Sequence, residues 1–91
     1  MNQDRRKEIE SAIDEIRTAL DSADNARSIL RDLQEQEQEA FDNMPEGLQQ
    51  ADRGQAMEQI AQDMDSAIDA IESAIGEIES ELDNINSAIN P

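Results

Sequence analysis

The side chains in this sequence that could do chemistry are carboxylates and arginines. The chain has no histidine and no cysteine, which removes the commonest general base, thiolate metal ligands and disulfides. Acids alternate in short runs, as in Glu35, Glu37 and Glu39. Carboxylates two residues apart on a helix point about 200° apart, and no run has the central glycine and closing glutamate of a calcium loop. We therefore expect solvated helix faces and no metal site.

Catalysis by paired carboxylates needs a cleft that desolvates one of them. With a single aromatic residue, Phe41, among 91, the chain has little material for such a cleft. It also has no nucleophile–base pair and no glycine-rich phosphate loop. The sequence predicts no enzyme, no catalytic residue and no cofactor.

The arginines offer a binding chemistry. Arg27 and Gln34 interrupt an apolar row in the first half of the chain, and a polar residue at such a position often fixes helix register, with acids as its partners. Alternatively, Arg27 with Arg31 or Arg53 lines an inter-subunit pocket for an anionic ligand, such as a small nucleotide. Both interpretations remain open at this point.

Charge is distributed unevenly along the chain. From Gly54 to Pro91 there is no lysine or arginine, and the net charge of the chain is −16. This charge repels nucleic acid and anionic membranes and favours a partner protein with a basic surface. An acidic surface that imitates nucleic acid and acidity that serves only solubility are both compatible with it. The acids that we expect on this surface are Asp65, Asp69, Glu72, Glu79 and Asp83.

A seven-residue repeat must position these groups. Residues 53–90 are predicted to form one helix with three adjacent apolar rows, which is too wide a stripe for one partner helix to cover. The rows are Met57, Met64, Ile71, Ile78 and Ile85; Ala61, Ile68, Ile75, Leu82 and Ile89; and Ile60, Ala67, Ala74 and Ala88.

Residues 3–42 are predicted to form a second long helix, capped by Asn2 or Asp4. Its alanine row, with that of the other helix, suggests a tight antiparallel seam; the rows are Ala12, Ala19 and Ala26, and Ala67, Ala74 and Ala88. Pro45 and Gly47 predict a turn over 43–52, with room for a short helix at 45–50. Asp52 and Gln55 have the spacing of a capping box, so the last helix is expected to start near Arg53.

We therefore expect an all-α fold over residues 1–91 as a single domain, a long antiparallel helical hairpin resembling a coiled coil. Its uncovered rows predict a homo-oligomer, a dimer or larger, that forms a helical bundle. Met44, Met57 and Met64 should cluster at the turn end as an apolar plug or an adaptable partner surface, together with Phe41, Leu48 and Ile60. No apolar run approaches the roughly 20 residues of a membrane span, and no signal peptide is evident, so a cytoplasmic protein is expected.

The turn carries a distinctive phrase, Ala-Phe-Asp-Asn-Met-Pro-Glu-Gly-Leu-Gln at 40–49, between an acidic run and the isoleucine-rich repeat. This phrase resembles that of small acidic helical proteins encoded by bacteriophages and prophages, although Ala51-Asp52 stands where a serine-containing cap is more usual. The resemblance implies a phage-encoded helical hairpin without an enzymatic role. If the phrase carries function, Glu46, Gln49 and Arg53 are its candidates; the alternative is that it only makes the bend.

The leading hypothesis is a phage accessory or counter-defence protein, in the cytoplasm of the infected bacterium, that neutralises a host factor by presenting an acidic surface to a basic groove. A second hypothesis is an oligomeric sponge that sequesters a nucleotide immune signal at inter-subunit arginines. A third is a structural or assembly role in the phage particle.

Overall fold

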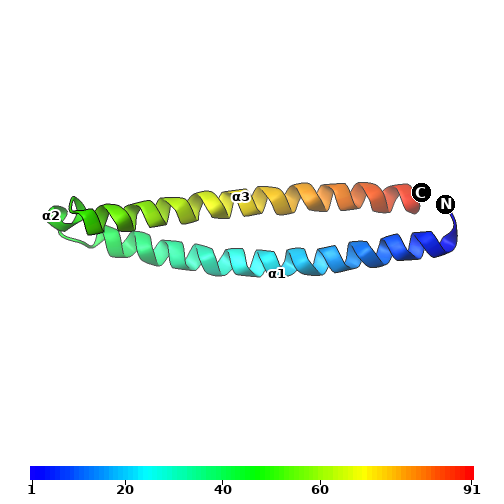
Figure 1. The fold of residues 1–91 in the computed structure, drawn as a ribbon, viewed down its shortest axis with the longest axis horizontal. Helices are drawn as coiled ribbons and strands as arrows, with labels where there is room; N and C mark the ends of the chain where they lie inside the picture. Colours follow the sequence, from blue (N-terminus) through cyan, green and yellow to red (C-terminus); the bar gives the residue numbers. More distant parts are fainter.

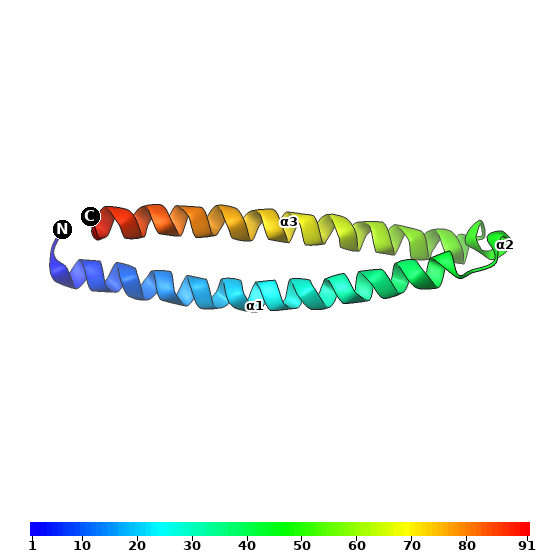
Figure 2. The same ribbon diagram turned by 180° about the vertical axis from the view of Figure 1, so that it is seen from behind.

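The protein is a long helical hairpin. The computed structural model describes residues 1–91 and contains α1 (Gln3–Asp42), α2 (Glu46–Gln49) and α3 (Asp52–Ile89). Figures 1 and 2 show α1 and α3 side by side along their whole length in opposite directions, with α2 at one end and both termini at the other. The molecule measures 68 by 16 by 16 Å. The prediction of an all-α antiparallel hairpin is confirmed.

The first helix begins with a side-chain cap. Asn2 is the cap, because its Oδ1 accepts a hydrogen bond of 2.7 Å from the backbone N–H of Arg5. Asp4, the other candidate, lies in the first turn, where its negative charge faces the positive end of the helix dipole. At the far end Pro45 follows the last turn of α1, and its carbonyl accepts from the N–H groups of Leu48 and Gln49, which starts α2.

The predicted capping box at Asp52 is wrong. The helix α3 begins one residue earlier than expected, with Ala51 as its N-cap and no side-chain cap, and Asp52 is already helical. Gln55 does not return to the cap; its Nε2 donates to the carbonyl of Gln49 at 2.9 Å. The physical reason lies at Gly54, which is buried against the backbone of α2. This close approach fixes where the helix begins.

The seam between the helices is made of large aliphatic side chains. The buried apolar residues are Ile13, Leu20, Ala61, Ile68, Leu82 and Ile89. The predicted seam of alanine rows is wrong, because the alanines of both rows are exposed. Turning Ile13, Leu20, Ile68 and Leu82 inward removes more apolar area from water than turning alanines inward would.

The seam leaves the hairpin with two different broad sides. On a helix, the row four residues after the buried one lies about 40° from it. The rows three residues after and one residue before it lie about 60° and 100° away in the other direction. The side that contains the row four residues after the buried one carries the cross-helix ion pairs of Arg17 and Arg31. We name it the ion-pair face. The other side is the apolar face; its exposed large residues are Ile16, Leu33, Ile60, Ile78 and Ile85, and its exposed alanines are Ala12, Ala19, Ala26, Ala40, Ala67, Ala74 and Ala88.

None of the three helices combines the length and the hydropathy that a bilayer crossing requires.

Candidate functional site

Arg27 lies inside the seam and is neutralised within the chain. It occupies the same seven-residue row as Ile13 and Leu20, and only 19% of its side chain is exposed. Its Nε donates to Asp24 at 2.9 Å, and its Nη1 donates to Glu72 of α3 at 3.0 Å. Of the two interpretations of this arginine, the structure therefore shows the one in which acids of the same chain are its partners. The sequence analysis missed Asp24, although its spacing of three residues from Arg27 on one helix is a signal for such a pair.

Arg31 and Arg17 continue the same pattern along the ion-pair face. Arg31 contacts Asp65 at 2.8 Å and Asp69 at 3.7 Å, and Arg17 contacts Asp83 at 2.8 Å. The hydrogen bond that Arg31 donates to Asp65 raises the pKa of Arg31. A raised pKa means that the guanidinium keeps its charge, and with it its contribution to stability, up to strongly alkaline solution. The guanidinium groups of these pairs therefore stay charged across the whole physiological range.

Four of the five predicted surface acids are used in these pairs. Asp65, Asp69, Glu72 and Asp83 each contact an arginine of α1. Glu79 makes no ion pair within 4 Å. The pKa of Arg17 is raised chiefly by the hydrogen bond that Arg17 donates to Asp83, and the charge of Glu79 adds to this effect. The free negative charge of the molecule therefore lies mainly on other carboxylates, because most of the 23 acids of the chain make no ion pair.

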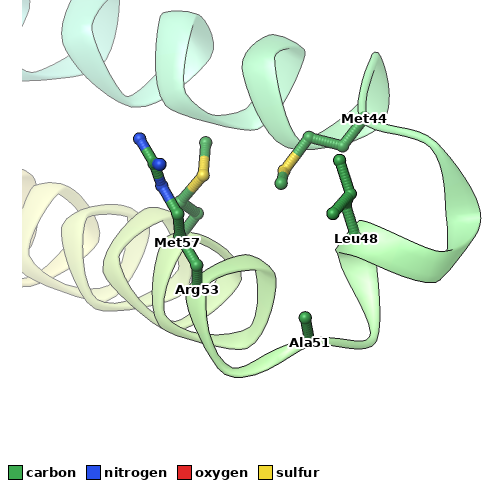
Figure 3. A pocket seen from close by; sticks show the side chains of 5 residues that line it. All are labelled: Met44, Leu48, Ala51, Arg53 and Met57. Carbon is green, nitrogen blue, oxygen red and sulfur yellow. The ribbon is translucent and has the colours of Figure 1, made fainter.

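The turn end holds an open pocket of about 290 Å³. Figure 3 shows Met44 and Leu48 on the turn segment facing Arg53 and Met57 from the first turns of α3, with Ala51 at the edge. The predicted methionine cluster therefore forms only in part, as a hollow with Leu48 more than half exposed. An apolar hollow with one guanidinium at its rim suits a ligand that has an apolar body and a negative group.

The three polar candidates of the turn do not form one site. Gln49 turns toward the backbone, where its Nε2 donates to the carbonyls of Phe41 at 2.9 Å and Asp42 at 3.4 Å. Glu46 is exposed in the first turn of α2 and does not line the pocket. Arg53 lines the pocket and makes no ion pair with any acid of the chain. Gln49 is thus a residue that closes the turn, and Arg53 is the one free guanidinium of the predicted ligand set.

No family model, curated protein or solved structure matches the chain.

Proposed function

We propose that this chain is a non-enzymatic binding protein that assembles into a homo-oligomeric helical bundle and presents its carboxylates to a basic surface on a partner protein. One observation carries the proposal, the separation of charge from apolar surface. Among the 23 acids of the chain, only Glu37 and Glu81 fall in the seven-residue rows of the apolar face. One side of the hairpin is thus suited to association, and the remaining sides are suited to electrostatic binding.

The size of the exposed surface supports assembly. The hairpin exposes 6461 Å², whereas a compact monomer of its 10.1 kDa mass is expected to expose about 5,300 Å². Its seam buries only six apolar side chains along 68 Å. Such a small core gives a long hairpin little stability by itself, and natural proteins of this kind usually gain it by oligomerising.

The net charge of −16 supports the choice of a basic partner. A rod with this charge attracts positive surfaces over about one Debye length, roughly 10 Å at 0.1 M salt, and accelerates their encounter. Since most of the acids beside the arginines of the ion-pair face already contact them, we assign the binding charge to the outer edges of both helices. Exposed acids there without an ion pair include Glu15, Glu35, Glu39 and Glu77.

The phrase at the turn supports the biological setting of the proposal. Its resemblance to small acidic phage and prophage proteins favours a counter-defence factor that acts in the cytoplasm of an infected bacterium by occluding a basic groove of a host protein. Occlusion needs no catalytic group, and it uses the property that this chain has in excess.

The test compares two variants at the same four positions. Partner recovered from host lysate is titrated with wild type, with a variant carrying Gln at Glu15, Glu35, Glu39 and Glu77, and with a control carrying Asp at these positions. We expect the Gln variant to bind at least about tenfold more weakly and the Asp control to bind as wild type does. Wild-type binding should also weaken steeply between about 50 and 200 mM salt. Equal binding by both variants, or binding that salt does not change, would contradict the proposal.

A second candidate function rests on the turn pocket. Arg53 has no carboxylate partner and stands beside an apolar hollow, which favours a small nucleotide as ligand, whereas Arg27 and Arg31 are occupied by their acids. In this case a cyclic nucleotide raises the melting temperature of wild type. Arg53→Ala abolishes the shift and Arg27→Ala retains it. A shift that survives Arg53→Ala excludes this site.

A further inference from the structure

We infer that the apolar face binds a second copy of this chain. The two copies lie antiparallel, so that the turn of one copy meets the termini of the other. The inference rests on the proposed assembly and adds its surface and its orientation. The face runs the length of the hairpin and contains residues from both long helices. Its exposed isoleucines and leucine, Ile16, Leu33, Ile60, Ile78 and Ile85, are each at least 40% exposed.

The area of this face matches what a stable dimer needs. A face of 68 by 16 Å offers about 1,100 Å² to a flat partner, and standard stable interfaces bury about 800 Å² on each side. The alanines between the larger side chains let two such faces approach closely. A copy of the same chain is the occupant that fits, since it brings an equally long and equally apolar face and leaves its own acids outside.

Charge selects the orientation. On the α1 part of the face, the rows contain one acid, Glu37, near the turn, and one basic residue, Arg5, near the termini. In an antiparallel pair related by a two-fold axis at the middle of α1, residue 37 of one copy lies opposite residue 8 of the other. The two charged groups are then about three residues, or 4–5 Å, apart along the axis, within reach of an arginine side chain. With both turns at the same end, Arg5 and Glu37 would lie at opposite ends of the bundle.

Two isoleucines give a matched test of the surface. Ile78 is on the apolar face and Ile29 is on the outer edge of α1, exposed by 40% and 61% respectively. We expect Ile78→Glu to halve the mass measured by light scattering, or to weaken self-association at least about 100-fold in sedimentation, and Ile29→Glu to leave both unchanged. An Ile78→Glu protein with the wild-type mass would overturn the inference.

Single cysteines test the orientation even if Ile78→Glu fails to fold. The chain has no cysteine of its own, so a disulfide can form only between copies. Position 23 lies at the two-fold axis, so Ala23→Cys should give a linked dimer on mild oxidation. Position 40 is separated from its copy by on the order of 50 Å, so Ala40→Cys should stay unlinked. A disulfide at position 40 and none at position 23 would overturn the antiparallel orientation.

The outcomes separate this inference from the function on which it rests. A wild-type protein that is monomeric at micromolar concentration would contradict both the proposed assembly and the second copy on this face. An oligomeric wild type that keeps its mass after Ile78→Glu, or that links through position 40, contradicts only the inference. Binding of the basic partner is read separately through its salt dependence.

Discussion

The close contact at Gly54 gives a sharp prediction about the turn. A Cβ at this position would lie 2.7 Å from the Cα of Gln49 and would also clash with the carbonyl oxygens of Leu48 and Gln49. These atoms belong to the backbone and cannot rotate away. Gly76 lies in the same helix, and a Cβ there would meet nothing within 4 Å. The same substitution, glycine to alanine, should therefore have opposite effects at the two positions.

The magnitudes follow from two competing contributions. Replacing glycine by alanine inside a helix stabilises by about 1 kcal/mol, because the unfolded chain loses conformational freedom. At Gly76 this gain stands alone. At Gly54 overpacking against backbone costs about 1–3 kcal/mol and separates α2 from the first turn of α3. We expect Gly76→Ala to raise the free energy of unfolding by about 0.5–1 kcal/mol and Gly54→Ala to lower it by up to about 2 kcal/mol net.

Urea unfolding followed by helical circular dichroism measures both variants. Protein concentration must be the same in each experiment, because association makes the apparent stability depend on it. Thermal melts should show the same signs, with shifts of about 4–8 °C for each kcal/mol in a chain of this size. If Gly54→Ala stabilises the protein as much as Gly76→Ala does, the packing of α2 against α3 is not as described.

Three further predictions concern the turn, the seam and the charge. Gln49→Ala removes the hydrogen bonds to Phe41 and Asp42 and should lower the free energy of unfolding by about 1 kcal/mol. The control Glu46→Ala should change it by less than about 0.5 kcal/mol. Equal effects of the two variants in urea titrations would contradict the role of Gln49. Arg27→Met replaces a seam ion pair by an apolar side chain and should leave stability unchanged or raise it by about 1 kcal/mol; a loss of more than about 1 kcal/mol in the same titration would show that the ion pair is needed. Salt should raise the melting temperature of the protein, because it screens the repulsion within a chain of charge −16. A melting temperature that decreases as salt is raised from about 50 to about 200 mM, the range where screening acts, would contradict this.

The heptad pattern predicted the hairpin but not its seam. A seven-residue repeat in three adjacent rows shows that one side of each helix is apolar, and Pro45 marks where the chain turns. Which rows face the other helix depends on how both helices rotate together. The structure turns Ile13 and Ile68 inward, and this rotation also brings Arg31 within reach of Asp65. Apolar burial and ion pairing act together here, and neither helix read alone contains that information.

The candidate site was predictable in its residue types and not in its pairing. The sequence identified Arg27, Arg31 and the acids of the last helix, but pairing across the hairpin depends on the axial register of the two helices. The N-cap of α3 escaped prediction for a similar reason. Gly54 packs against α2, and this tertiary contact overrides the local capping preference of Asp52. Arg53 lies at the turn, in the first turn of α3, and makes no ion pair.

The mass of the protein in solution tests the central claim most directly. Sedimentation equilibrium or light scattering at about 10 μM, a concentration at which a dimer with submicromolar affinity is assembled, should give at least twice the 10.1 kDa of the chain. A stable, fully helical species of 10.1 kDa would contradict the claim that the hairpin functions with its apolar face covered by another copy.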